Sequence, residues 1–190
     1  MNYAKVAVIV VAALSISPTA LSISPAELAD VPPELRHHNW GPSCTHASLC
    51  TALEYHNQHE LAQWWRNNNY GGQTIFDLML LLDAAGIPYD YTIEADIDFL
   101  DRAVANRFPV ILFHVPNHHC VNLVDLDSRF ATILDNNSEW AYYKVTRDYL
   151  WNEWNFHWST DERARNSSGW AIAVCLSPPP PWPALPSDDL

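Results

Sequence analysis

Apolar residues recur at intervals of three and four positions through the first half of the chain, a spacing typical of amphipathic helices. The run IFDLMLLLDAA places Ile75, Leu78 and Leu82 on one face, with Thr74 before it as a helix cap and Gly86 after it. Ser43 is the corresponding cap for an earlier helix. We therefore expect four helices, at 44 to about 57, 59–66, 75–85 and 97–106.

Strand-like alternation replaces this spacing in the second half of the chain. PVILFHV (109–115) is rich in β-branched and aromatic residues, and CVNLVDL (120–126) and RFATILD (129–135) alternate around a tight turn at Asp127 and Ser128. A helix is expected at 146–154, and a last strand at 170–176 is entered through Gly169. Helices followed by an antiparallel sheet predict an α+β fold, with the N-terminal helices packed on the sheet.

The ends of the chain differ from the part between them. Residues 1–29 carry one early charge, Lys5, and then an apolar stretch, which predicts either a secretory signal cleaved after Ser22 or Ala26, or a membrane anchor. Residues 30–177 form the expected single domain, and 178–190 form a proline-rich tail that cannot pair in a sheet. The protein is thus expected to be secreted or membrane-anchored, outside the cytoplasm.

Composition narrows the range of partners to be expected. The 190 residues include 10 basic and 22 acidic ones, giving a net charge of −12 with neutral histidines. This charge disfavours nucleic acid and anionic membrane surfaces, so membrane attachment would come only through the N-terminal anchor. We expect a monomer that meets a peptide or protein substrate. The aromatic-rich stretch WAYYKVTRDYLWNEWNFHW (140–158) is expected to serve mainly as core, with a substrate groove or sugar-stacking surface as the alternative.

The four cysteines allow two interpretations. Cys44, Cys50, Cys120 and Cys175 permit three fully paired connectivities, and export would allow disulfides to form. Cys50 lies well around the helix from Cys44, and Cys120 alternates away from His119, so these two and Cys175 are expected to be packing or paired thiols. Short paired cysteine spacing is absent, which leaves a zinc site only as a minor alternative, with Cys44 or Cys120 joined by nearby histidines (His37, His38 and His46).

Cys44 is also placed for nucleophilic chemistry. The start of a helix stabilises a thiolate through its free N–H groups and dipole. A base is needed nearby, and His119 stands where the 120–126 strand begins, with His118 as its rival. Pairing across the turn brings Asp135 beside His119, where a carboxylate would orient the imidazole. Asn136 and Asn137 remain alternatives for that role.

These motifs resemble a known family. Cys44 at a helix start, GGQTIFDLMLLLDAAGIPY, the PVILFHV strand, H-x-V-x-L-V-x-L-D and ILDNN are similar in order and spacing to papain-like cysteine peptidases, specifically the bacteriocin-processing, double-glycine leader peptidase-like group. The similarity covers roughly residues 36 to 140, about half of the chain. It implies a papain-like fold and a triad of Cys44, His119 and Asp135.

The resemblance predicts a cysteine peptidase or amidohydrolase that needs no cofactor. One family residue is replaced: the glutamine six positions before the cysteine, which donates to the oxyanion, is His38 here. From chemistry alone we expect Asn39 and the backbone N–H of Cys44 to take its place. The alternatives are an inactive papain-like peptide-binding module, a disulfide-stapled domain that binds glycans or proteins, and transglutaminase-like acyl transfer by the same three residues.

Overall fold

The computed structural model describes residues 31–114, 119–155 and 168–176. The predicted signal or anchor at 1–29, His118, the end of the aromatic stretch at 156–158 and the proline-rich tail from 178 all lie outside these ranges. Among the helices so described, none is both long and apolar enough to cross a lipid bilayer.

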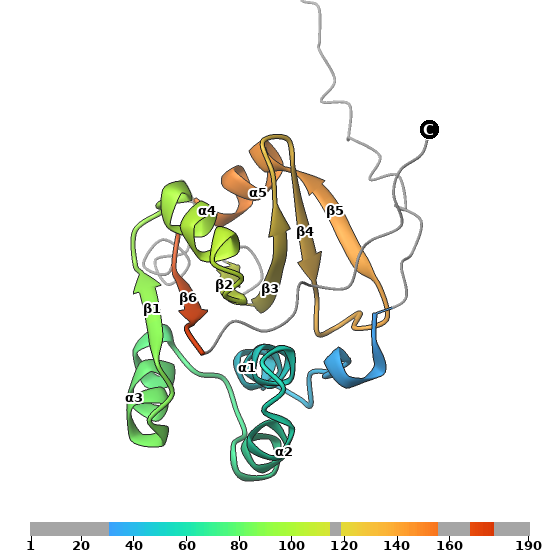
Figure 1. Cartoon of the computed structure of the whole chain (residues 1–190), viewed down its shortest axis with the longest axis vertical. Coiled ribbons are helices and arrows are strands. Elements are labelled where there is room, and N and C mark those ends of the chain that lie inside the picture. The colour runs from blue at the N-terminus through green and yellow to red at the C-terminus, as the bar shows by residue number, and fades with distance from the viewer. Residues whose placement is uncertain (1–30, 115–118, 156–167, 177–190) are drawn as a thin grey trace, which may run out of the picture.

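The chain folds into an α+β domain around a six-stranded antiparallel sheet, which confirms the expected class (Figure 1). The strand order across the sheet is β1-β6-β2-β3-β4-β5. The last strand in sequence, β6, therefore lies between the first two. The bounds are β1 Tyr89–Thr92, β2 Val110–His114, β3 His119–Leu126, β4 Phe130–Leu134, β5 Tyr142–Thr146 and β6 Ala171–Val174.

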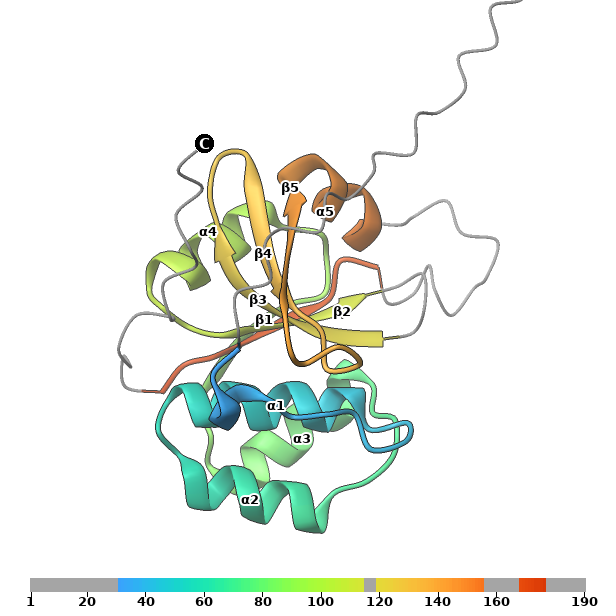
Figure 2. The same ribbon diagram turned by 90° about the vertical axis from the view of Figure 1, so that its right-hand side faces the viewer.

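Helices cover both faces of this sheet (Figure 2). Helices α1 to α3 form one layer, and α4 and α5 lie on the opposite side. Their bounds, with a short 3-10 turn η1 at Pro33–Leu35, are α1 Cys44–Tyr55, α2 His59–Asn68, α3 Ile75–Ala85, α4 Ile97–Ala105 and α5 Arg147–Trp154. Each of the four predicted N-terminal helices and the predicted helix near 146–154 is confirmed.

Strand alternation divides the interior into two apolar clusters. On β2, Ile111 and Phe113 face the α1–α3 layer, whereas Val110 and Leu112 face α4 and α5. The same alternation makes β6 buried along its whole length, because both of its faces are covered. It also turns Cys120 of β3 toward the α1–α3 layer. Cys120 therefore lies on the same side of the sheet as Cys44.

Local sequence signals account for the ends of α3. The Thr74 hydroxyl accepts a hydrogen bond from the Asp77 backbone N–H, and the Asp77 carboxylate accepts one in return from the Thr74 N–H. Gly86 ends the helix in the left-handed conformation, as predicted. The expected cap of α1 differs. Ser43 occupies the N-cap position, but its hydroxyl accepts a hydrogen bond from Gly71 N–H at 2.9 Å instead of capping the helix.

Two strands were not expected from the sequence. β1 (YDYT) is short, and its two middle residues are exposed. β5 lies inside the aromatic stretch, which the sequence analysis expected to be core or a substrate groove. Because β1 falls between α3 and α4, the chain does not place four helices before all strands. The predicted order of helices first and strands afterwards is therefore wrong in this detail.

Gly169 makes a testable contact where the chain enters β6. Its φ is +74°, and a Cβ added there would lie 2.4 Å from the backbone nitrogen of Ala95. We expect Gly169→Ala to lower the free energy of unfolding by about 2–3 kcal/mol, from backbone strain and steric overlap together. Urea unfolding measures this loss.

Gly86→Ala is the matched control for that measurement. Gly86 also has a positive φ, +66°, but a Cβ there would meet nothing within 4 Å. Strain alone should cost about 1 kcal/mol. Equal losses for the two variants would show that the contact with Ala95 contributes nothing.

Candidate active site

Cys44 lies at the start of α1, held by the loop that precedes it. The Ser43 backbone N–H donates to Asn39 Oδ1 at 3.0 Å, which fixes the chain direction just before the cysteine. Only 9% of Cys44 is exposed. Since the first N–H groups of a helix have no partner within the helix, they face the thiol side of this turn with a positive potential. The location suits an anionic sulfur.

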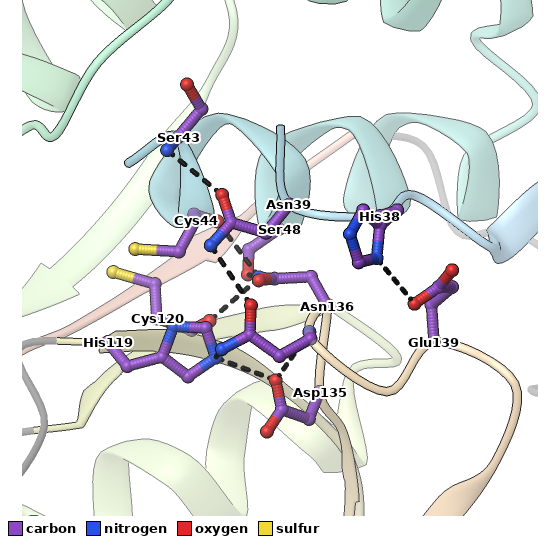
Figure 3. A network of polar contacts seen from close by, with 11 residues as sticks. His38, Asn39, Ser43, Cys44, Ser48, His119, Cys120, Asp135, Asn136 and Glu139 are labelled. Carbon is purple, nitrogen blue, oxygen red and sulfur yellow. Dashed lines mark hydrogen bonds and ion pairs between the residues drawn. The ribbon is translucent and has the colours of Figure 1, made fainter. Parts of the chain in front are cut away.

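His119 and Asp135 come from neighbouring strands and meet beside Cys44 (Figure 3). β3 begins at His119, and Asp135 directly follows β4. His119 Nε2 donates a hydrogen bond to Asp135 Oδ1 at 2.7 Å. A hydrogen bond also joins His119 to Cys44. The structure thus brings together the three residues that the sequence predicted, in the order thiol, imidazole, carboxylate.

The register of this hairpin contains an irregularity. Pairing runs from Leu126 opposite Ala131, shifts between Leu123 and Asp125, and continues with Asn122 opposite Leu134. The sequence-based register assumed an uninterrupted ladder from the turn. The contact between His119 and Asp135 forms nevertheless, because Asp135 lies just beyond the last strand residue and its side chain reaches back to the ring.

The surroundings favour a thiolate and an imidazolium. A hydrogen bond from Cys120 is the largest influence on Cys44, burial opposes it, and His119 assists it, so that the pKa of Cys44 falls from 9.0 to about 4. Burial lowers the pKa of His119, but the hydrogen bonds and negative charges of Asp135 and Cys44 outweigh it and raise this pKa from 6.5 to about 9. Both charges therefore persist across neutral pH.

Cys120 is buried in the apolar cluster, as expected for a packing thiol, but it also lies beside Cys44. It does alternate away from His119 on β3, but the face it occupies is the one on which α1 packs. Its sulfur faces that of Cys44 in Figure 3, and the two side chains are hydrogen-bonded. The Thr45 hydroxyl lies 3.2 Å from the same sulfur. A buried thiol therefore stands beside the candidate nucleophile.

Asn136 ties the site together from the loop after β4. Its Nδ2 lies 3.0 Å from Cys44 O, 2.9 Å from Ser48 Oγ and 2.8 Å from Cys120 O. The Asn136 side chain is buried, and none of these three hydrogen bonds involves the His119 ring. Of the three candidates for orienting His119, Asp135 makes the short hydrogen bond, Asn136 has this different role, and Asn137 Nδ2 lies 3.3 Å from His119 Nε2.

The oxyanion side of the site differs from the pattern of the peptidases that the sequence resembles. His38 occupies the glutamine position, and its Nδ1 bonds Glu139 Oε2 at 2.9 Å. Asn39 lies closer to the triad: its Nδ2 donates to Asn137 Oδ1 at 3.1 Å while its Oδ1 holds Ser43. Among the described residues one Asn39 amide hydrogen is engaged, which leaves the other available to an oxyanion.

Cys50 and His46 are buried and make hydrogen bonds within the core. All four cysteines are free thiols. Cys50 is fully buried, its Sγ donates to Ala62 O, and burial raises its pKa to about 12. His46 accepts a hydrogen bond at Nδ1 from Trp65 Nε1 at 3.0 Å. Within the described ranges, no group of three or more metal-ligating side chains is close enough to hold a metal ion.

Much of the aromatic stretch is structural where it is described. Trp154 is fully buried in the cluster beneath α4 and α5, whereas Trp140 is 63% exposed and carries the Arg36 guanidinium 4.7 Å from its ring centre. Tyr149 is the other exposed large aromatic side chain among residues 140–155. The expectation that this stretch serves mainly as core stands for residues 140–155.

Comparison with known proteins adds no assignment. No protein-family model matches the chain, and no curated protein matches its sequence. The chemical interpretation of the site therefore rests on its residues and their geometry. Sequence reasoning found Cys44, His119, Asp135 and Asn39, but it missed Cys120 and the bridging role of Asn136. The ILDNN motif placed Asp135, Asn136 and Asn137 side by side as candidates, but only the folded structure shows that Asn136 is the buried one.

Proposed function

We propose that this protein is a papain-like cysteine peptidase or amidohydrolase whose catalytic residues are Cys44, His119 and Asp135. The single observation that carries the proposal is the hydrogen-bonded series from Cys44 through His119 to Asp135, with charges displaced toward thiolate and imidazolium. Such a pair is the activated form of a cysteine nucleophile. A peptide or protein is the proposed substrate, met outside the cytoplasm if residues 1–29 direct export.

The chemistry follows from these positions. The Cys44 thiolate attacks an amide carbonyl, and the imidazolium of His119 gives its proton to the departing amine, leaving an acyl group on sulfur. Water then attacks the thioester, with His119 taking its proton. The carboxylic acid leaves and the thiolate is restored. Asp135 keeps the Nε2–H of the ring directed away from the sulfur, so that the other ring nitrogen handles the proton.

Oxyanion stabilisation is assigned to two donors. The backbone N–H of Cys44 lies in the first turn of α1, and Asn39 offers its second amide hydrogen. Asn39 is positioned through Ser43 and Asn137, which bond its oxygen and its nitrogen. This arrangement would substitute for the absent glutamine.

The pH dependence of Cys44 alkylation tests the ion pair. Iodoacetamide should label Cys44 of the native protein quickly at pH 6, because the thiolate is lost only as the pH falls through about 4. Hydrolysis should also decline above about pH 9, where His119 loses the proton needed by the leaving group. A bell-shaped profile of kcat/KM with limbs near these values is expected, and peptide mass mapping measures the labelling.

His119→Ala is the informative variant and Cys50 the internal control. Without the imidazolium the pKa of Cys44 should rise, and once it exceeds about 6, each further pKa unit lowers the thiolate fraction at pH 6 about tenfold. Cys50 should stay unlabelled in the folded protein at the same pH, because burial raises its pKa to about 12. If Cys44 of the native protein reacts only above pH 8, no thiolate–imidazolium pair exists and the catalytic proposal fails.

An inactive peptide-binding module of the same architecture is the second candidate. It is favoured by His38, which replaces the glutamine and is bonded to Glu139, and by the engaged amide of Asn39. Loss of an oxyanion donor costs on the order of a hundredfold or more in rate. A complex peptide library would separate the two candidates. Cleavage products and a Cys44 acyl-enzyme support the peptidase, whereas peptide binding without either supports the module.

A further inference from the structure

The two thiols of the site form a pair that peptide hydrolysis does not need. Cys44 and Cys120 come from α1 and β3, far apart in sequence, yet their sulfurs face each other and their side chains are hydrogen-bonded (Figure 3). Hydrolysis as proposed uses one sulfur. A second thiol so placed requires its own explanation.

The backbone holds these two residues at short range. A single nitrogen, Asn136 Nδ2, lies 3.0 Å from the carbonyl oxygen of Cys44 and 2.8 Å from that of Cys120. A disulfide requires Cα atoms within about 7 Å and side chains directed toward each other. Because one amide nitrogen bonds both carbonyl oxygens, the two backbones lie close together, and the two sulfurs lie side by side in Figure 3. This arrangement favours closure of a disulfide.

We propose that Cys44 and Cys120 form an oxidisable dithiol, closed to a disulfide by peroxide and reopened by a dithiol reductant. Closure would remove the sulfur nucleophile reversibly and protect it from further oxidation. This inference does not depend on the proposed peptidase function, because it requires only a reactive Cys44 and a neighbouring thiol.

The reaction balances in two steps. The Cys44 thiolate attacks one oxygen of hydrogen peroxide, the O–O bond breaks, and hydroxide leaves, which gives a sulfenic acid on Cys44. The Cys120 sulfur then attacks the Cys44 sulfur. The S–O bond breaks, and the departing hydroxide takes the thiol proton of Cys120 to form water. Two thiols are oxidised by two electrons, and the peroxide is reduced.

The first step also prepares Cys120 for the second. Burial is the main cause of the raised pKa of Cys120, and the hydrogen bond and negative charge of the Cys44 thiolate raise it further. Oxidation of Cys44 to the neutral sulfenic acid removes that charge. Thr45, whose hydroxyl lies 3.2 Å from Cys120 Sγ, can then stabilise the sulfur as it attacks.

The other cysteines offer no equivalent pair. Cys50 Sγ bonds the backbone oxygen of Ala62 within the apolar cluster, and Cys175 Sγ bonds the oxygen of Ala173 on the far side of β6. Each of these sulfurs is thus bonded to a backbone oxygen and not to another thiol. They therefore serve as controls inside the same molecule.

Mass mapping of the full chain tests the proposal. The protein is treated at pH 7 with a small excess of hydrogen peroxide, then alkylated and digested. We expect a linked peptide pair containing Cys44 and Cys120, loss of Cys44 alkylation, and its recovery after dithiothreitol. If Cys44 is oxidised to sulfinic acid or resists both peroxide and diamide, with no linked pair formed, the proposal is wrong.

Cys120→Ser provides the sharpest comparison, because serine can still donate a hydrogen bond to Cys44 but cannot form the disulfide. In this variant Cys44 should accumulate as a sulfenic acid that dimedone traps, and dithiothreitol should recover less alkylation after long exposure. Cys50→Ser should behave as the unaltered protein. Should Cys120→Ser fail to fold, the linked peptide in the unaltered protein still decides the matter. If the linked pair forms but the reduced protein cleaves no peptide, the peptidase proposal fails and the dithiol proposal stands.

Discussion

Cys44→Ala is expected to abolish peptide hydrolysis, lowering kcat by at least about 10³-fold. Cys120, the other thiol of the site, cannot replace it as a nucleophile, because burial raises the pKa of Cys120 and keeps it protonated. The variant removes one small, mostly buried side chain at the start of α1. The free energy of unfolding should therefore change far less than the rate. Cleavage of a peptide library, followed by kinetics on the best substrate, measures the loss.

Two controls give this result its meaning. Cys50→Ala removes a cysteine six residues later in the same helix but on its buried side, and it should retain kcat even if it unfolds more easily. Peptide binding by Cys44→Ala should persist, since the other groups of the site remain. Undiminished hydrolysis by Cys44→Ala would place the reaction elsewhere and exclude the triad.

Local signals predicted the helices well because each carries its own boundary. Thr74 with Asp77, and Gly86 in the left-handed conformation, define both ends of α3 within its own residues. The strand β1 has no such signal: four residues, YDYT, are ordered by pairing with β6, which lies more than 75 positions later in the chain. A strand this short, with exposed middle residues, carries little signal of its own when a distant partner orders it.

The site shows the same division between local and distant causes. The roles of Cys44, His119 and Asp135 followed from a helix start and a hairpin, both readable over short spans. The placement of Cys120 depended on which face of β3 meets α1, and that is fixed only when the whole sheet is assembled between two helical layers. Period-two alternation correctly placed Cys120 and His119 on opposite faces of β3. It could not show that both side chains contact the sulfur of Cys44.

Asn136→Ala should cause a large loss of stability. Its amide serves Cys44 O, Cys120 O and Ser48 Oγ, and removing it leaves buried acceptors without that donor. Each such loss costs about 1–3 kcal/mol. The Asn136 oxygen is itself buried without a hydrogen-bond partner among the described residues, and its removal offsets part of the cost. We expect the free energy of unfolding to fall by about 3–4 kcal/mol, measured in urea.

Two substitutions separate hydrogen bonding from lost volume. Asn122→Ala removes a buried amide of β3 whose Nδ2, among the residues that the structure describes, donates to Ser48 O alone, so a loss of about 1–2 kcal/mol is expected. Asn136→Asp keeps the volume but replaces the donor with a carboxylate that faces three oxygens. It should destabilise the protein at neutral pH at least as much as Asn136→Ala, and less so in acid, where the carboxylate gains a proton and can donate. If Asn136→Ala costs no more than Asn122→Ala, Asn136 does not join α1 to the sheet, and the two cysteines are held in place by packing alone.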